Sequence, residues 1–486
     1  MQSPSGRAGP RLALLAFTQL IVALDYNIVY VALPDLGSAL GFSAQSVQWV
    51  VSAYAVGLGG LLLFGGRAVD RLGARRMFVL GLALYGVASL AGGLATSPGP
   101  LVAARAVQGV GGALLTPATL ALIYRGFAEG PQRNRAMGAW GMAGSAGLAA
   151  GSLLGGVLTG YLGWQWVFFV NVPLALLAVL AAPRLLPADP TRPAGGASFD
   201  LPGALLATAG ATLLVFGLVS GPEAGWGSAR AAGALTAGAL LLAALAVVET
   251  RTRDPLVPPR LLRDRGLVTT MVVIAVFMGT LGGGYYVLTN HLQPVLGYGA
   301  LKAGLAFLPL TLVCMVAALW VAPAMVGRWG HRATLAAGML GTAAGLAALT
   351  AGMSADGPFW ALLPGSVVWG VSGGVAFVAL FVAAGSGIAP AEQGVASGLA
   401  TTAKEIGGAL FLALFVAVAN AGLAVDAGAS RPVADVLDGL RAAGWAAAAL
   451  TAAGALVALL LPRPGDPAPE PLPSTPSTSV PEEIAS

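Results

Sequence analysis

The chain has 486 residues, of which 57% are hydrophobic and only 9% are charged. Soluble domains have about a quarter of their residues charged, so this composition excludes a soluble globular protein and indicates one that crosses a bilayer many times. The net charge of +5 lies mostly in short loops between apolar runs. Membrane topology explains this charge better than nucleic-acid binding does.

Fourteen apolar runs are each about 20 residues long, which is the length a helix needs to cross a bilayer. The first run follows Arg7 and Arg11 but is too long for the core of a signal peptide, so we expect it to be retained. We predict spans at 12–33, 47–66, 77–95, 100–123, 136–158, 164–182, 201–220, 231–248, 266–289, 300–324, 333–353, 359–383, 396–419 and 442–461.

Lysine and arginine predict the orientation, because cytoplasmic loops hold their excess. With the N-terminus inside, 19 of the 25 Lys and Arg residues fall in cytoplasmic segments and four in outside loops. Both termini are therefore expected in the cytoplasm, and abundant Ala, Gly and Arg suggest a bacterial membrane. We expect an N-tail (1–11), a six-helix bundle (12–182), a linker with two extra spans (183–265), a second bundle (266–461) and a disordered Pro-rich tail (462–486).

The first span contains a carboxylate, in the stretch "IVALDYNIVYVALP" at 21–34. A charge at this depth costs about 2.5 to 3.5 kcal/mol, so Asp25 needs a partner. Arg105 in the fourth span lies at a similar depth and can reach Asp25 if the two helices adjoin. Asp25 then either exchanges a proton or forms a permanent pair, or it is held neutral by neighbours such as Asn27. Gln108 lies one turn from Arg105. It either forms a hydrogen bond with Arg105 or with the substrate, or it is an amide that only packs against its neighbours.

The loop after the second span reads "GRAVDRLGARR" at 66–76. Its glycines form turns, and its acid and bases suit a charge and helix-dipole latch across the cytoplasmic side, which breaks when the protein opens inward. The alternative is anchoring by positive charge alone, which does not explain the acid. The proposed latch residues are Gly66, Asp70, Arg71, Gly73 and Arg75.

Three further features lie within spans. Glycines three and four apart in the fifth span allow close helix packing.

Lys404 and Glu405 are adjacent in the thirteenth span. Because neighbouring positions on a helix face apart, we expect each side chain to find a different partner. The two residues are candidates for a second coupling or substrate site. Aromatic and amide side chains are candidates for a substrate cavity, although most such residues are core or lipid-facing: Asn27, Tyr30, Tyr54, Trp140, Tyr285, Tyr286 and Trp369.

The chain also repeats itself. The stretch "VDRLGAR" at 69–75 matches "VGRWGHR" at 326–332 in four of seven positions, at an offset of 257 residues. Repeated halves are typical of secondary transporters, in which two bundles rock around a site near the midplane.

These stretches resemble the major facilitator superfamily, and within it the fourteen-span drug:proton antiporters. "LDYNIVYVALP" (24–34) resembles the span-1 motif, and "GRAVDRLGARR" (66–76) the loop motif. "RAVQGVGGALLTPA" (105–118) is similar to the span-4 pattern, and "GLAAGSLLGG" (147–156) to the antiporter motif, with a serine in place of its proline. The resemblance implies that this motif packs where the two bundles meet: Gly147, Gly151, Ser152, Gly155 and Gly156.

The expected function is export of amphipathic or hydrophobic drugs in exchange for protons, by a chain that is not an enzyme and acts as a monomer. The sequence has no phosphate-binding loop, and its two histidines and one cysteine are too scattered for a metal site. We expect no cofactor and no nucleic-acid partner. A facilitator or symporter for a small metabolite is the alternative, followed by a membrane-embedded enzyme.

Overall fold

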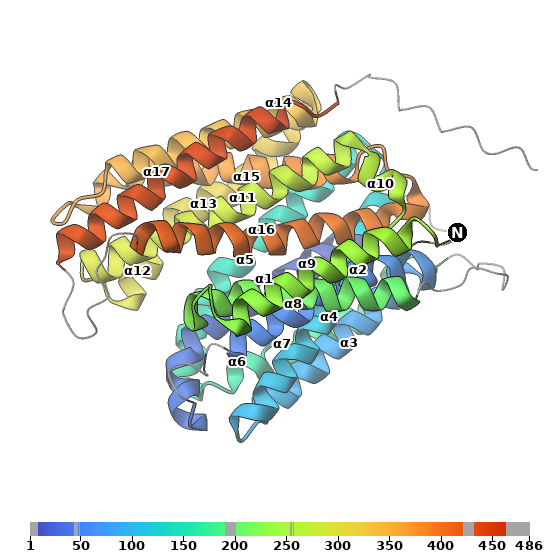
Figure 1. Ribbon diagram of the computed structural model, residues 1–486, viewed down its shortest axis with the longest axis horizontal. Helices are drawn as coiled ribbons and strands as arrows, with labels where there is room; N and C mark the ends of the chain where they lie inside the picture. Colours follow the sequence, from blue (N-terminus) through green and yellow to red (C-terminus); the bar gives the residue numbers. More distant parts are fainter. Residues whose placement is uncertain are drawn as a thin grey trace, which may run out of the picture.

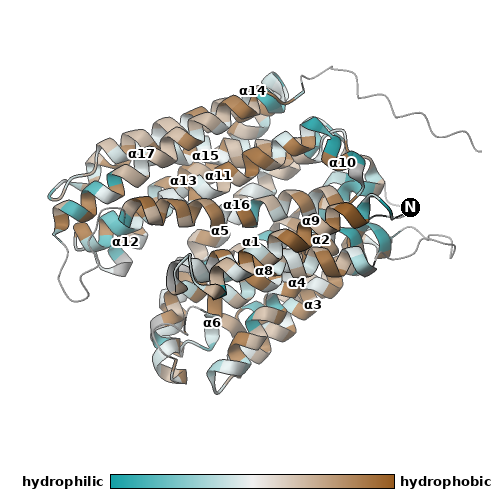
Figure 2. Ribbon diagram, viewed as in Figure 1, coloured by the Kyte–Doolittle hydropathy of each residue, from teal (hydrophilic) through white to brown (hydrophobic). Residues whose placement is uncertain are grey.

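A computed structural model describes residues 8–42, 47, 49–189, 201–252, 255, 257–420 and 432–462. Over these residues the chain is helical and contains no β-strand (Figure 1). Figure 2 shows apolar residues along most of the helix lengths and hydrophilic residues gathered near their ends, as expected of helices that cross a bilayer. The Pro-rich segment 463–486 lies outside the described residues.

The first half of the chain forms one group of helices. Glycines let their backbones approach closely: a Cβ atom at Gly109 would lie 2.3 Å from the Tyr54 carbonyl oxygen, and one at Gly111 would lie 2.8 Å from that of Gly81. Helix α1 packs on α5, and α4 packs between α2 and α3. The group comprises α1 (Ala8–Leu40), α2 (Trp49–Leu72), α3 (Ala74–Gly93), α4 (Pro98–Gly126), α5 (Pro131–Leu162), α6 (Trp166–Phe169) and α7 (Asn171–Leu185).

Two helices of the linker region follow. Helices α8 (Leu201–Ala224) and α9 (Ala229–Glu249) pack on each other, and α8 also lies against α2 and α16. The Ser228 hydroxyl caps α9 by accepting a hydrogen bond from the Ala231 amide at 3.2 Å. The short helix α10 (Pro259–Arg263) leads into the second half.

The second half is less regular than the first. Its helices include two π-helical turns, η2 and η3, and α14 departs from helical geometry at Gly330, where φ is 76°. The elements are α11 (Arg265–Asn290), η2 (His291–Val295), α12 (Ala300–Ala306), α13 (Leu308–Val316), η3 (Ala317–Val321), α14 (Ala322–Ala351), η4 (Phe359–Ala361), α15 (Leu363–Gly385), η5 (Pro390–Glu392), α16 (Gln393–Asn420) and α17 (Val433–Ala458).

Within the described residues, twelve helical segments are long and apolar enough to cross a membrane, so the expected count of fourteen is not reproduced by length and composition. Two features account for the difference. The run Lys302–Ala351 counts as one segment of 50 residues, although it is made of parts of α12, α13, η3 and α14 in succession and departs from helical geometry at Gly330. The apolar part of α8, Pro202–Leu218, is counted among the shorter helices.

The two halves are joined mainly by α2 and α4 packing on α16, and by α5 packing on α13, η3, α14 and α15. Tyr124 and Trp140 from the first half share one core cluster with Phe381 from the second. In Figure 1 the ribbons of the two halves diverge toward the ends that carry α6 and α12. The contacts between the halves therefore concentrate toward the other end of the molecule, where residues 66–70 and 390–398 lie.

Candidate functional site

Asp25 and Arg105 are in contact in the interior of the first half. The Arg105 Nη1 atom donates a hydrogen bond to Asp25 Oδ2 at 2.7 Å, and both side chains are buried. Helices α1 and α4 adjoin here, which brings together the two charges that the sequence places at similar depths. Each ion thus has the partner that a buried charge requires.

Two amides complete the surroundings of the Asp25 carboxylate. Gln108 Nε2 donates to Asp25 Oδ1 at 2.9 Å and also to Ser89 Oγ at 2.9 Å. Asn171, the first residue of α7, donates from Nδ2 to the same Oδ1 at 2.6 Å. The carboxylate therefore accepts hydrogen bonds from three side chains on two helices, an arrangement that suits its ionised form because that form can only accept.

Arg105 has partners that do not depend on Asp25. Its Nε atom donates to the Val50 carbonyl oxygen at 2.9 Å, and Nη1 donates to Gln108 Oε1 at 2.6 Å. Its guanidinium carbon also lies 4.6 Å from the centre of the Tyr54 ring, within the range of a cation–π contact. The arginine would therefore keep several partners if Asp25 became neutral.

The sequence did not point to Asn171, Ser89 or Tyr85. Asn171 Oδ1 and the Tyr85 hydroxyl are buried without a hydrogen-bond partner among the described residues. A polar residue in an otherwise apolar span is the one signal that could have drawn attention to Asn171, since an unpaired amide in hydrocarbon costs several kcal/mol, on the order of 2 to 7.

The cavity candidates occupy three different environments. Tyr30 is 45% exposed, and its ring centre lies 5.7 Å from that of Tyr26, which is 46% exposed. Asn27 instead ties α1 to α5, because its Nδ2 atom donates to the Leu148 carbonyl oxygen at 2.9 Å. Tyr54 is buried under Arg105.

The remaining aromatic candidates pack against other rings. Trp140 is buried where the halves meet, with its ring 5.7 Å from that of Phe377. Tyr285 lies between Phe307 and the buried Trp369, at 5.3 Å from each. Tyr286 is half-buried at the edge of the same cluster. In this conformation Tyr30 is thus the candidate ring with the largest accessible surface.

Lys404 and Glu405 pair with each other, contrary to the expectation that each would find a different neighbour. Lys404 Nζ lies 2.7 Å from Glu405 Oε1, and the two side chains are 32% and 23% exposed. The expectation was wrong because these long side chains bend around the helix, although their Cβ atoms point about 100° apart. The result is a partly exposed pair with no net charge.

The loop acid Asp70 joins the two halves. Its Oδ1 and Oδ2 atoms accept hydrogen bonds from the backbone amides of Gly394 and Val395, at 2.9 and 2.8 Å, in the first turn of α16. The Arg125 guanidinium, at the end of α4, donates to the same carboxylate and also to the Pro390 carbonyl oxygen at 3.0 Å. Asp70 is thus a cap, in charge and in hydrogen bonding, for a helix of the other half.

The other latch candidates make contacts in different parts of the molecule: Gly66 contacts the second half, whereas Arg75 makes its contact within the first half. At Gly66 a Cβ atom would lie 2.5 Å from the Gly394 carbonyl oxygen, so α2 and α16 are in backbone contact there. Gly73 has a left-handed φ of 108°, and the backbone amide of Arg75 donates to Asp189 Oδ1 at 2.9 Å within the first half. Arg71 is the basic residue of the last turn of α2.

The glycine motif of α5 lies inside the first half and not at the contact between the halves. Cβ atoms at Gly147, Gly151 and Gly155 would lie 2.5, 2.4 and 3.0 Å from atoms of α1, and one at Gly156 would meet nothing within 4 Å. The helix has no kink here, and residue 152 is helical.

Glycines nearer the start of α5 meet the other half: a Cβ atom at Gly138 would lie 2.6 Å from the Ala318 carbonyl oxygen. The expected position was wrong because the motif lies on the face of α5 that packs on α1. The glycines that precede the motif lie on the face that packs on η3 and α15. Over the described residues, no group of three or more His, Cys, Asp or Glu side chains could hold a metal ion.

Comparison with known proteins identifies the family. The model of the Major Facilitator Superfamily matches residues 15–412. The chain belongs to this superfamily. It is accordingly a multi-pass membrane transporter and not an enzyme.

Similar proteins of the superfamily include antibiotic exporters. The chain is 40% identical to the puromycin resistance protein pur8 of Streptomyces alboniger over 84% of this chain and 81% of that protein. It is also 40% identical to the cephamycin export protein CmcT of Amycolatopsis lactamdurans, over 84% of each chain. The crystal structure of the human organic anion transporter MFSD10 shares the fold, with a TM-score of 0.68 at 15% identity, over 94% of this chain and 100% of that one.

Proposed function

We propose that the chain exports amphipathic or hydrophobic drugs or antibiotics in exchange for protons. The names of its relatives support antibiotic export, and the buried contact of Asp25 with Arg105 supports the coupling. That contact carries the proposal, because a permanent buried pair could be replaced by apolar residues at little cost. The presence of such a pair in a transporter is better explained by a contact that forms and breaks.

Protonation of Asp25 would break the pair. The neutral carboxyl no longer attracts the guanidinium, and its O–H needs an acceptor. Asn171 Oδ1 is buried beside it and has no hydrogen-bond partner among the described residues, so after the amide rotates it can accept a hydrogen bond from that O–H. Arg105 meanwhile keeps Val50, Gln108 and the ring of Tyr54. The two protonation states therefore have different helix contacts, which is what a coupled transporter requires.

The proposed topology has fourteen spans, with both termini in the cytoplasm of a bacterial membrane. A helix of 50 residues would be about 75 Å long, more than twice a hydrocarbon core of about 30 Å. We therefore divide the run Lys302–Ala351 at Gly330, and count α8 as a span because it packs along α9 and α2. We keep the two bundles (12–182 and 266–461) and the linker (183–265), and propose that the chain acts as a monomer.

The substrate surface that we propose includes Tyr30, its neighbour Tyr26 and the pair Lys404 and Glu405. All four side chains are partly exposed, and Glu405 is close enough to both tyrosine hydroxyls to interact with them electrostatically. Aromatic rings beside a neutral ion pair suit amphipathic compounds of either charge. One proton entering across 100 mV supplies about 2.3 kcal/mol for export.

The proposal is tested in inverted membrane vesicles that hold a proton gradient, with puromycin as the first compound. Adding the compound should release protons from the lumen of vesicles that contain the protein. Asp25→Asn should abolish this release. Uphill transport at the normal rate by Asp25→Asn would show that Asp25 is structural, and transport without proton release would favour a facilitator.

A second variant separates coupling from folding. Asp25→Asn alone leaves Arg105 without its counter-ion, and breaking a buried pair from one side costs about 3 to 5 kcal/mol. The double variant Asp25→Asn with Arg105→Gln removes both charges and should recover much of that stability. If the double variant is folded and binds the compound but still releases no protons, the loss is one of coupling.

A further inference from the structure

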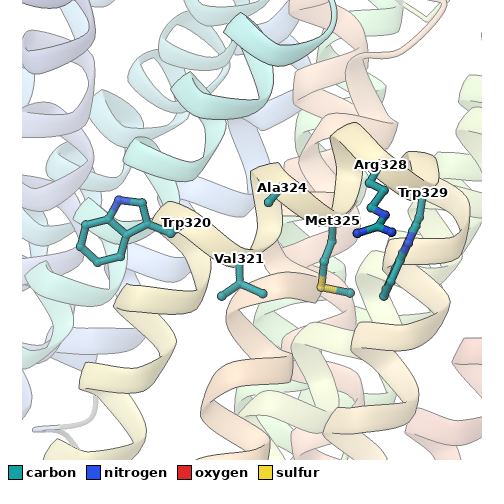
Figure 3. A pocket seen from close by; sticks show the side chains of 6 residues that line it. All are labelled: Trp320, Val321, Ala324, Met325, Arg328 and Trp329. Carbon is teal, nitrogen blue, oxygen red and sulfur yellow. The ribbon is translucent and has the colours of Figure 1, made fainter.

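We propose that a groove on α14 binds an anionic phospholipid of the cytoplasmic leaflet, an inference that rests on the orientation proposed above. The groove has a volume of about 400 Å³ and is lined by Trp320, Val321, Ala324, Met325, Arg328 and Trp329 (Figure 3). These positions recur every three to four residues, so they form one stripe along a single helix face.

Local backbone irregularity accounts for the hollow. The π-helical turn Ala317–Val321 ends where α14 begins, and Pro323 occupies the first turn of α14. A π-helical turn followed by a proline displaces the helix face. Gly327, in the same stretch of helix, also has open space where a Cβ atom would lie.

The length of the stripe fits one leaflet. Nine residues separate Trp320 from Trp329, which corresponds to about 13.5 Å along a helix, roughly half of a hydrocarbon core of about 30 Å. In the proposed orientation Arg328 and Trp329 lie at the cytoplasmic boundary and Trp320 lies near the midplane. An acyl chain can therefore follow Val321 and Met325 while the headgroup reaches Arg328.

The positive charge of Arg328 at the end of the groove favours a lipid with an anionic headgroup. Arg328 is exposed and makes no hydrogen bond or ion pair with the part of the chain that the structure describes, and Figure 3 shows it beside the indole of Trp329. Trp320 and Trp329 are 64% and 52% exposed. Tryptophans at the membrane–water interface anchor at the headgroup level, which is the position of Trp329, and basic pockets at the cytoplasmic side attract anionic headgroups.

The internal repeat explains why this arginine is available. Gly327 and Arg328 occupy the positions of Asp70 and Arg71 in the first half, at the offset of 257 residues. The second copy of the loop thus has an arginine without the neighbouring acid. The charge of Arg328 does not join the two halves, so it is available to bind a lipid phosphate.

The test counts lipids bound to the purified protein by native mass spectrometry, with phosphatidylglycerol and phosphatidylcholine of the same acyl chains. The wild type should bind phosphatidylglycerol about fivefold more tightly, the effect expected of one basic side chain near a membrane surface. Arg328→Gln should remove that preference. Ala324→Trp, which fills the groove but keeps the charge, should displace the lipid. Arg76→Gln, an exposed arginine at the same end of the first half, is the matched control and should behave as the wild type.

Any of three lipid-binding results would overturn the inference: equal binding of the two lipids by the wild type, an undiminished preference in Arg328→Gln, or undiminished binding in Ala324→Trp. Lipid-free dimers that Trp320→Ala and Trp329→Ala dissociate would also overturn it, by assigning this face to a second copy of the chain. Transport assays on the same preparations separate the two proposals, because coupled export without a lipid preference leaves the proposed function standing.

Discussion

Two aspartates cap helices with the same geometry in different parts of the molecule. Asp189 accepts hydrogen bonds at 2.9 and 3.0 Å from the backbone amides of the second and third residues of α3. Asp70 accepts them at 2.9 and 2.8 Å from the second and third residues of α16. Both place a negative charge at the positive end of a helix dipole.

The two caps differ in which parts of the fold they join. Asp189 follows closely after α7, which packs on α3 within the first half, so the contact of Asp189 with α3 is preserved when the halves move as rigid bodies. Asp70 belongs to the first half and α16 to the second, so this contact must break when that side opens. The same local chemistry therefore stabilises a fold in one place and a conformation in the other.

Asp70→Asn weakens the cap that joins the two halves, and it has the largest expected effect. The amide keeps one acceptor, loses the second and no longer carries the charge opposite Arg125. One lost charge-assisted hydrogen bond is worth about 1.5 to 3 kcal/mol. The open form should therefore gain at least tenfold in population, which spin labels at Arg76→Cys and Ala389→Cys would report as a longer distance, in a chain with Cys314→Ala.

Asp189→Asn is the matched control for that variant. It loses the same kind of hydrogen bond but within one half. Its thermal stability should fall, while the distance between the labels stays that of the parent chain. Equal opening in the two variants would contradict the distinction between a cap within one half and a cap between halves.

The sequence predicts some of these features well and others not at all. The series of apolar runs, the buried charges of Asp25 and Arg105 and the unusual acid at Asp70 all follow from composition and from the cost of burying charge. The partners do not follow, because Asn171, Asp189 and the amides of α16 are distant in sequence from the groups that they contact. The break at Gly330 falls between the predicted spans 300–324 and 333–353, although the left-handed φ of that glycine leaves no mark on hydropathy.

Arg125→Gln separates the charge opposite Asp70 from the helix cap itself, and we expect a smaller effect on the open population. It removes the charge that faces Asp70 and the hydrogen bond to the Pro390 carbonyl oxygen, and it leaves both backbone hydrogen bonds of the cap in place. The Arg125 side chain is 26% exposed, and partly exposed pairs are worth about 0.2 to 1 kcal/mol. The open population should rise by no more than about sixfold in the spin-label experiment. An effect as large as that of Asp70→Asn would mean that the ion pair, and not the helix cap, holds this side closed.

Tyr124→Phe has the smallest expected effect, although its contact also crosses the halves. The Tyr124 hydroxyl donates to the Phe381 carbonyl oxygen at 2.6 Å. That oxygen lies inside α15, where helix geometry gives it a second donor, so the variant leaves no acceptor unpaired. A neutral hydrogen bond contributes about 0.5 to 1.5 kcal/mol, and the ring keeps its packing against Gly385. We expect the label distance to shift less than in Arg125→Gln, because Asp70 still caps α16. Opening comparable to that of Asp70→Asn would instead show that closure depends on many equivalent contacts and that Asp70 has no special place among them.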